Sequence, residues 1–329
     1  MSTVFVTGGT GFIGQRLVQW LTKRGDTVHI LCRPTADTVP SDTTNLRIFY
    51  GDILDPPSIE RAMAGCTRVF HLAGYARNWA RDPHAFIETN VNGTKNLLAA
   101  AQKTGVKKVV CTSTSVTLGP SNGAAVDEST KRTVDFFTDY ERSKSMTEEA
   151  IQSYTKAGLS VVIVNPTRVF GPGLLTEGNS VTKMIQMYLR GKWRMLLGDG
   201  KGVGNYAFVE NIAQGHLLAM ENGATGEKYV LGGENVSYND FFSLVAQLSN
   251  RKYRLFHVPT PLALAFSEVE QRRALWLGQY PTITPGWVRT FLADWAFSSA
   301  RAERELGYTI TPLAEALKKT ITWLEQNQA

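Results

Sequence analysis

The sequence contains few cysteines and histidines, and this scarcity excludes several classes of protein. Its three cysteines, Cys32, Cys66 and Cys111, are an odd number and lack the spacing of a metal motif. Such a set favours reduced thiols over a disulfide framework, so we expect a cytoplasmic location. The five histidines also lack the spacing of metal ligands: His29, His71, His84, His216 and His257. The sequence accordingly predicts no metal site.

The sequence also lacks a long hydrophobic run and a strong excess of one charge. No run of about 18 apolar residues is present, so we expect no transmembrane helix. The chain starts without the basic region and cleavage site of a signal peptide. Its formal net charge of +6 comes without a cluster of Lys and Arg, so we expect no nucleic-acid partner. This small excess of positive charge either aids solubility or attracts an anionic ligand such as a dinucleotide phosphate.

What the first half does contain is a regular alternation of short apolar runs and helix-period stretches. The expected strands are Thr3–Thr7, Thr27–Cys32, Leu46–Tyr50, Arg68–Leu72, Lys108–Thr112 and Val161–Asn165. The expected helices between them are Ile13–Arg24, Pro57–Ala64, Glu88–Thr104 and Tyr140–Ala157. Nearly continuous apolar strands that alternate with helices predict an α/β fold of the Rossmann type, with a doubly wound parallel sheet covered on both faces.

The pattern changes after Asn165, where several prolines and glycines mark a turn-rich exit from the sheet. We therefore expect a dinucleotide-binding domain over residues 1–165 and a smaller, mainly helical substrate lobe over residues 166–329. The expected elements of the second half are helices at Val181–Arg190 and Phe208–Met220, a strand at Lys228–Leu231, and mostly helix after Asp240. Segments within about residues 205–235 are expected to return to the sheet.

A glycine-rich loop connects the first strand to the first helix. One glycine allows a tight turn, one lets phosphates approach the backbone, and one lets the helix pack on the strand. The helix N-terminus then offers free N–H groups to a pyrophosphate. The residues of this loop that we predict to bind a dinucleotide are Gly8, Thr10, Gly11, Phe12, Ile13 and Gly14.

The end of the second strand distinguishes the two nicotinamide dinucleotides. An NAD site usually carries Asp or Glu there, whereas this chain has Cys32 and Arg33. The Arg33 guanidinium can hold a 2′-phosphate through two hydrogen bonds, which favours NADP(H) over NAD(H), unless it is simply a solvated side chain. After the third strand, Asp52 and the adjoining Ile53 are placed to contact the adenine, although Asp52 also suits a turn or a helix cap.

A tyrosine and a lysine four residues apart, Tyr140 and Lys144, share one face of an expected helix. A free tyrosine has a pKa of about 10, and a nearby ammonium lowers that pKa. The fifth strand ends in Thr112, Ser113 and Thr114, at the edge where ligands bind in open α/β sheets. Each feature alone is common on helix surfaces and in polar loops. Together with the glycine loop, they predict a catalytic site.

With these motifs, the chain resembles the extended short-chain dehydrogenase/reductases, a group that includes sugar-nucleotide epimerases and dehydratases. The resemblance runs nearly end to end. Besides the glycine loop, Tyr140 and Lys144, it is carried by His71-Leu72-Ala73-Gly74, Asn90-Val91-Asn92-Gly93-Thr94 and Asn165-Pro166-Thr167-Arg168-Val169-Phe170-Gly171-Pro172. Within the group, the chain looks most like dihydroflavonol-4-reductase-like and 3β-hydroxysteroid-dehydrogenase-like proteins and the hopanoid-associated epimerases.

The resemblance implies that NADPH reduces a ketone or aldehyde, or that the reverse reaction oxidises the alcohol. Tyr140 would donate the proton, Lys144 would lower its pKa and bind the ribose, and Thr114 would hydrogen-bond the carbonyl oxygen, with Ser113 as the alternative. The cofactor contacts that the resemblance implies are Leu72, Ala73, Gly74, Asn90, Thr112, Tyr140, Lys144, Pro166 and Val169. A homodimer formed by a pair of helices is a further implication.

The substrate residues are the least defined part of the sequence. Tyr75 and Trp79 follow the fourth strand and are expected either to form an apolar wall of the pocket or to anchor an ordinary loop. The remaining substrate candidates are Thr167, Phe170, Met184 and Tyr188, although helical methionines are more often core residues. The apolar stretch Leu262–Phe266 faces a substrate, a dimer partner or the core, and the core is the default expectation.

Two other functions stay open. A nucleotide-sugar epimerase or dehydratase keeps NAD bound and favours an acid after the second strand, where this chain has Cys32-Arg33. The dehydratases that it resembles place Asp-Glu directly after the catalytic Thr, where this chain has Ser115-Val116. A non-enzymatic NADP-binding sensor commonly loses the Tyr or the Lys, and this chain keeps both.

Overall fold

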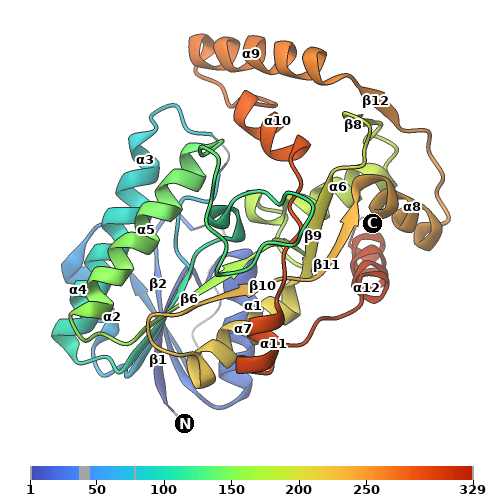
Figure 1. The fold of residues 1–329 in the computed structure, drawn as a ribbon. Coiled ribbons are helices and arrows are strands. Elements are labelled where there is room, and N and C mark those ends of the chain that lie inside the picture. Colours follow the sequence, from blue (N-terminus) through green and yellow to red (C-terminus); the bar gives the residue numbers. More distant parts are fainter. Residues whose placement is uncertain (1, 37–44, 78, 328–329) are drawn as a thin grey trace.

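The computed structural model describes residues 2–36, 45–77 and 79–327, and its centre is a seven-stranded parallel sheet (Figure 1). The strands lie in the order β10-β6-β5-β4-β1-β2-β3. Their bounds are β1 Thr3–Thr7, β2 Thr27–Cys32, β3 Leu46–Tyr50, β4 Arg68–His71, β5 Lys108–Thr112, β6 Val161–Pro166 and β10 Lys228–Leu231. The Rossmann-type α/β fold is thereby confirmed, and the predicted strands differ from the observed ones by at most one residue.

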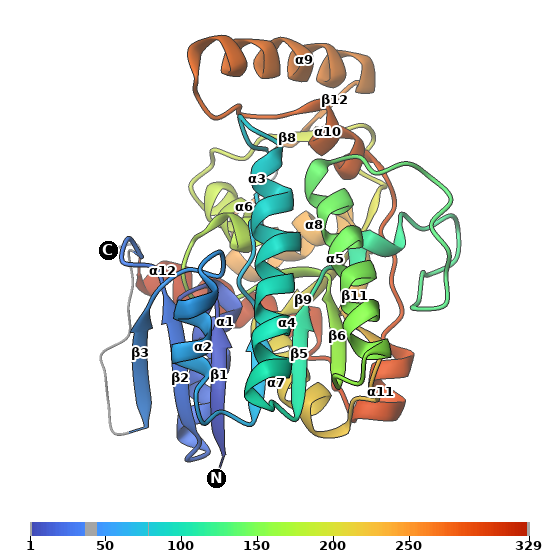
Figure 2. The ribbon, with the colours of Figure 1, turned by 90° about the vertical axis from the view of Figure 1, so that its left-hand side faces the viewer.

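Helices cover both faces of this sheet (Figure 2). One face is covered by α1 (Phe12–Lys23), α7 (Val209–Asn222) and α11 (Ala300–Leu306), and the other by α2 (Pro56–Met63), α4 (Gly93–Thr104) and α5 (Asp139–Lys156). Successive side chains of a strand point to opposite faces. In β1, Val4 and Val6 therefore enter the core beneath α1 and α7, whereas Phe5 enters the core beneath α2 and α4.

The predicted helix Glu88–Thr104 is divided into two helical types. The short α3 (His84–Phe86) leads into a π-helical turn, η1 (Ile87–Asn92), and the regular α4 begins only at Gly93. The wider turn leaves the Asn90 carbonyl oxygen to accept hydrogen bonds from the Thr94 and Thr147 hydroxyls, at 2.6 and 3.0 Å. Helical periodicity in the sequence does not distinguish π from α geometry over one turn, and π turns are frequent at functional sites.

The rest of the chain after β6 forms a second layer of helices and short strands beside the sheet (Figure 1). Its helices are α6 (Ser180–Leu189), α8 (Tyr238–Ser249), α9 (Thr260–Leu277), α10 (Pro285–Leu292) and α12 (Leu313–Gln326). Its strands form the sheets β11-β9-β7 (Glu234–Ser237, Val203–Phe208 and Arg168–Phe170) and β12-β8 (Phe256–Val258 and Met195–Leu197). Of the later elements, α7, β10 and α11 pack in the main body. The short strands were absent from the sequence-based expectation because three to six residues carry little periodicity.

Candidate active site

The carboxyl ends of the parallel strands meet at one edge of the sheet, where the glycine loop also lies. Gly8 has φ of +72°, and a Cβ there would lie 2.6 Å from the Ala73 backbone nitrogen. A Cβ at Gly14 would lie 2.0 Å from the Gly8 carbonyl oxygen. Gly11 caps α1 without a side-chain hydrogen bond. This cradle of bare backbone at a helix N-terminus fits a dinucleotide phosphate.

Not every predicted loop residue presents its side chain to this cradle. The Phe12 side chain is buried in the core and lies against Gly173, so only its backbone can face the cradle. Thr10 and Ile13 are half-buried. At the first turn of α1, an apolar side chain gains more from burial than from the open edge. A cofactor contact of Phe12 would therefore be made by its backbone, and it stays a prediction.

The residues at the ends of β2 and β3 lie as follows. The Arg33 side chain is exposed and has no hydrogen-bond or ion-pair partner among the described residues. The Asp52 carboxylate accepts a hydrogen bond from the Leu54 N–H at 2.9 Å, so it acts as a turn residue. Ile53 is buried and packs against Gly93 at the start of α4. The Ile53 side chain therefore packs in the core, and the contacts of Asp52 and Ile53 with an adenine stay predictions.

Tyr140, Lys144 and Thr114 come together at the ends of α5 and β5. The Lys144 Nζ donates to the Thr112 carbonyl oxygen at 2.7 Å. Burial raises the pKa of Tyr140 to about 12, and a hydrogen-bonding interaction with Thr114 opposes this rise. Burial lowers the pKa of Lys144 to about 8. The role of Lys144 in lowering the pKa of Tyr140 stays a prediction.

The neighbouring hydroxyl residue, Ser113, points away from Tyr140 and binds a buried carboxylate. Its Oγ donates to the Glu148 carboxylate at 2.5 Å, and both side chains are buried. Thr117, Asn165 and Lys228 also bind this carboxylate. Ser113 is thus a structural residue, and between the two alternatives only Thr114 faces Tyr140.

The Thr112 side chain also lies away from the site, where its hydroxyl is hydrogen-bonded to His216 Nε2 at 2.9 Å. Only its carbonyl oxygen reaches Lys144. His71 is a second buried histidine, and it bridges the Thr7 and Thr94 hydroxyls at 2.7 and 2.9 Å. Burial and the nearby Lys144 charge lower the pKa of His71 to about 3, so it is neutral. Both histidines tie strands to helices.

Asn90 holds the loop after β4 against α5. Its Oδ1 accepts the Tyr75 N–H at 2.7 Å, and its Nδ2 donates to the Ser143 hydroxyl at 2.9 Å. Gly74 lies between these groups: a Cβ there would be 3.0 Å from Asn90 Oδ1 and 3.7 Å from Lys144 Nζ. Asn90 is therefore placed to position the loop, and it lies beside Lys144. Leu72 and Ala73 are half-buried at the same edge, and Pro166 and Val169 are buried near it.

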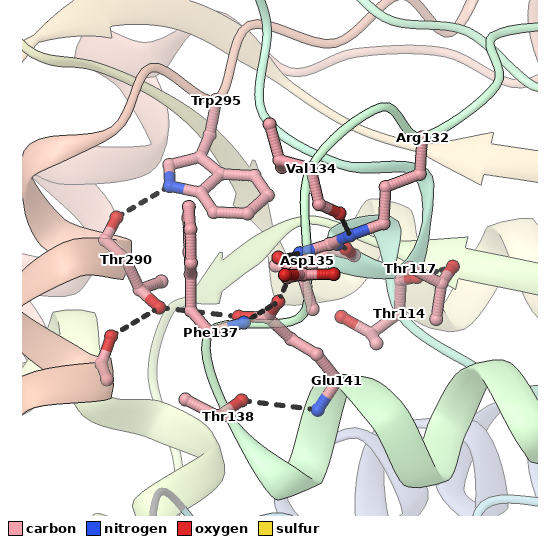
Figure 3. A network of polar contacts seen from close by, with 12 residues as sticks. Thr114, Thr117, Arg132, Val134, Asp135, Phe137, Thr138, Glu141, Thr290 and Trp295 are labelled. Atoms are coloured by element: carbon pink, nitrogen blue, oxygen red, sulfur yellow. Dashed lines mark hydrogen bonds and ion pairs between the residues drawn. The ribbon is translucent and has the colours of Figure 1, made fainter.

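A buried ion pair fixes the start of α5 (Figure 3). The Arg132 guanidinium lies 2.8 Å from Glu141, directly after Tyr140 in sequence, and their side chains are 10% and 2% exposed. Thr290 on α10 donates to the same carboxylate at 3.3 Å, and the Trp295 indole donates to the Thr290 carbonyl at 2.6 Å. Sequence reasoning missed this network because its members are far apart in sequence and share no motif.

A pocket of about 60 Å³ opens beside Thr114. Its lining residues are Thr114, Ser115, Val116, Thr167, Arg168, Asn205, Thr290, Trp295 and Phe297. Thr167 thus lies in the pocket, where it donates to Asn205 at 2.8 Å. Trp79 lies edge-on to Tyr280 with ring centroids 5.6 Å apart, and Tyr75 lies edge-on to Phe86.

Three of the expected substrate residues are core residues instead. Phe170, Met184 and Tyr188 are buried together in the hydrophobic cluster between α6, α8 and α12. The Tyr188 hydroxyl donates to the Arg251 carbonyl at 3.0 Å. The physical reason is that α6 turns its apolar face toward this cluster rather than toward the pocket, as amphipathic helices commonly do.

The comparisons with known proteins agree with this fold. The chain belongs to the NAD dependent epimerase/dehydratase family, whose sequence profile matches residues 4–232, and hence to the extended short-chain dehydrogenase/reductases. A Synechocystis sp. protein named "Putative dihydroflavonol 4-reductase" is 31% identical, covering 98% of this chain and 94% of that protein.

Two further relatives match over nearly their whole lengths. "Sterol demethylase protein B" of Methylococcus capsulatus is 28% identical, with 98% of both chains covered. The crystal structure of gox2253 superposes with a TM-score of 0.84 at 31% identity, covering 99% of this chain and 98% of the other. The family is therefore shown over the whole chain, including the second layer that lines the pocket.

Proposed function

We propose that this chain is an NADP(H)-dependent oxidoreductase that interconverts a ketone or aldehyde and the matching alcohol. The observation that carries the proposal is the meeting of Thr114, Tyr140 and Lys144 at the sheet edge that also holds the glycine cradle. A bound nicotinamide dinucleotide supplies or accepts the hydride in this chemistry. The residues that would hold it are those of the glycine cradle, with Arg33 at the end of β2.

The proton chemistry follows from the environments of the side chains. A pKa of about 12 keeps the Tyr140 phenol protonated near neutrality, so its Oη can donate to a carbonyl oxygen. The Thr114 hydroxyl would hydrogen-bond the same oxygen. Lys144 is mostly charged at neutral pH with a pKa of about 8 and is anchored by the Thr112 carbonyl. It would hold a ribose hydroxyl and favour proton transfer through its charge.

The preference for NADP(H) rests on Arg33 and on the lack of a carboxylate at positions 32 and 33. The Arg33 guanidinium is exposed and is not neutralised by an ion pair within the described residues. It is therefore available to a 2′-phosphate. The pocket combines polar groups with Trp295 and Phe297, which supports a moderately apolar substrate. The names of two relatives refer to a dihydroflavonol and a sterol, which agrees with such a substrate.

The test is an NADPH-oxidation screen across aldehydes, ketones, flavonoid-like and steroid-like carbonyl compounds and UDP-sugars, followed by variants. Tyr140→Phe is expected to lower turnover by about 10²–10⁴-fold while NADPH binding is retained. Tyr154→Phe on the same helix, whose hydroxyl donates to the Lys95 carbonyl oxygen, is the matched control and is expected to keep normal turnover. Near-normal turnover of Tyr140→Phe would refute the proposed role of Tyr140.

The same screen distinguishes the rival functions. An epimerase would interconvert sugar nucleotides without net oxidation of NADPH and would be purified with bound NAD. A sensor would bind NADPH and turn over none of the compounds. We also propose a homodimer, as the family resemblance implies, and sedimentation velocity of the purified chain tests it.

A further inference from the structure

Arg168 begins β7 and belongs to the motif of residues 165–172, and the proposed proton chemistry does not use it. It is half-buried and lies in the wall of the pocket beside Thr114. Among the described residues that line this pocket, Arg168 alone carries a charge. Because a guanidinium in a protein stays protonated, this wall of the pocket is positively charged.

Two tyrosines hold the Arg168 guanidinium in place. Arg168 on β7 and Tyr206 on β9 are register partners, so their side chains lie on the same face of the small sheet. The guanidinium lies 5.8 Å from the centre of the Tyr206 ring and 5.0 Å from the centre of the Tyr238 ring. Its Nη1 also donates to the Tyr238 hydroxyl. These contacts fix the direction of the side chain before a ligand binds.

Within the part of the chain that the structure describes, no carboxylate neutralises this guanidinium. Arg168 takes part in no ion pair there, and its Nε and Nη2 have no hydrogen-bond acceptor. Glu234 lies in the same row of the sheet, but β9 separates it from Arg168, and its carboxylate accepts the Leu313 N–H at 2.7 Å. A buried charge without a partner costs free energy, and contacts with tyrosine rings offset only part of that cost.

The Tyr206 hydroxyl is a second polar group without a partner. It is buried next to Arg168, and among the described residues no group contacts it with hydrogen-bond geometry. Both side chains lie against Gly204, where a Cβ would be 2.9 Å from Arg168 Nη1 and 3.1 Å from Tyr206 Cζ. Gly204 is bridged to Trp295, which lines the pocket. An excess of donors favours a ligand that brings only acceptors, as a carboxylate does.

We propose that Arg168 binds a carboxylate of the substrate, so that the substrate is an oxo acid or the matching hydroxy acid. The free Nε–H and Nη2–H groups form the edge of a guanidinium that holds a carboxylate through two parallel hydrogen bonds. The carboxylate does not react: it orients the carbonyl group toward Thr114 and Tyr140. The inference rests on the proposed function, since it names the class of compound on which the same site acts.

The size of the pocket limits the distance between the carboxylate and the carbonyl group. Its volume of about 60 Å³ is enough for roughly four to six water molecules, so it holds a carboxyl group and only a few further atoms. Thr114 and Arg168 line this one pocket. We therefore expect 2-, 3- and 4-oxo acids to be better substrates than acids in which a longer chain separates the two groups.

A carboxylate suits this wall better than the diphosphate of a sugar nucleotide. A diphosphate is larger and carries more charge, and proteins bind such groups with several cations or with the N–H groups of a helix N-terminus. Arg168 is the single cation among the described lining residues. One guanidinium matches the single charge of a carboxylate.

The experiment compares acids with their esters, using the purified full chain. The probes are benzoylformate, a 2-oxo acid, and 3-benzoylpropionate, a 4-oxo acid, each with its methyl ester, which keeps the ketone and removes the charge. Calorimetric titration, with and without NADP⁺, measures binding without turnover, and NADPH oxidation measures kcat/KM. We expect each acid to bind about 10²-fold more tightly than its ester.

Three variants assign the preference to Arg168. Arg168→Met is expected to lower the affinity and the kcat/KM for the acids by about 10²-fold and to leave the values for the esters unchanged. Arg168→Lys keeps the charge without the planar pair of donors, so it should restore part of the preference. Arg194→Met is the matched control, because Arg194 also lies over a tyrosine ring, 4.2 Å from the centre of Tyr253, but is exposed and outside the pocket.

The outcomes for the proposed function and for this inference are distinguishable. Equal losses for acids and esters in Arg168→Met would make Arg168 a structural residue and overturn the proposal. Acids that bind no more tightly than their esters would overturn it too, as would binding of UDP-glucose, but not of the acids, through Arg168. Acid binding that depends on Arg168 without NADPH oxidation would refute the proposed function and keep the carboxylate site, whereas reduction of the esters alone would do the reverse. Circular dichroism verifies folding, and Arg168→Lys serves if Arg168→Met does not fold.

Discussion

Replacing Arg132 by methionine tests the network at the start of α5 most directly. Arg132→Met keeps much of the side-chain length but leaves the Glu141 carboxylate, which is 2% exposed, without its ion-pair partner. Removing one member of a buried ion pair commonly costs about 3–5 kcal/mol. Arg132 also donates to the carbonyl oxygens of Val116, Val134 and Asp135. Because a domain is stable by only about 5–15 kcal/mol, we expect a large fall in the urea midpoint.

The loss should depend on pH, and its sign follows from Glu141. Burial raises the pKa of the Glu141 carboxyl, and the Phe137 N–H and the Arg132 guanidinium lower it again. Without Arg132 that pKa rises further, so the folded state binds a proton more tightly than the unfolded chain does. Stability is then lost as the pH rises through the folded-state pKa. The difference between wild type and variant is therefore smaller near about pH 5 than near about pH 7.

Equilibrium urea unfolding at both pH values is the assay, with Glu141→Gln completing a double-mutant cycle. In the Glu141→Gln background, Arg132→Met should cost much less, because no buried carboxylate is left unpaired. Arg304→Met removes an exposed arginine that pairs with Glu305 and should leave the midpoint unchanged. A cost for Arg132→Met below about 1 kcal/mol at neutral pH, typical of an exposed pair, would contradict the reasoning.

Three further predictions concern the cofactor edge. Between about pH 8 and pH 10.5 the unfolded lysine binds a proton, but folded Lys144, with its pKa of about 8, does not, so stability should rise with pH in this window. Lys144→Met should abolish this rise, which urea midpoints measured at several pH values would show. A rise that persists in the variant argues against the lowered pKa. Gly14→Ala should abolish NADPH binding in fluorescence titrations, since its Cβ would lie 2.0 Å from the Gly8 oxygen. Gly178→Ala, whose nearest contact is 3.7 Å, should bind normally. Arg33→Ala should raise the Kd for NADPH about tenfold or more and leave that for NADH unchanged, whereas equal losses would remove the basis for the NADP(H) preference.

The sequence was sufficient for the sheet and the cofactor edge because both depend on local patterns. Apolar strands followed by helices define the doubly wound fold, and the glycine spacing at Gly8 and Gly14 serves backbone contacts within a few residues. The pairing of Tyr140 with Lys144 likewise depends only on the period of one helix. Such patterns involve residues that are close together in the sequence, so the sequence alone predicts them.

Only the tertiary structure decided which side chains meet across the chain. Ser113 and Thr114 are adjacent hydroxyl residues, and the direction of each side chain sends one to Glu148 and the other to Tyr140. The ion pair of Arg132 with Glu141 depends on a loop that the sequence leaves undefined. Leu262 and Phe266 on α9 are a similar case: the default expectation placed this apolar stretch in the core, whereas both side chains are exposed, at 64% and 58%. Burial and partner choice are properties of the assembled layers, so they emerge only when the chain has folded.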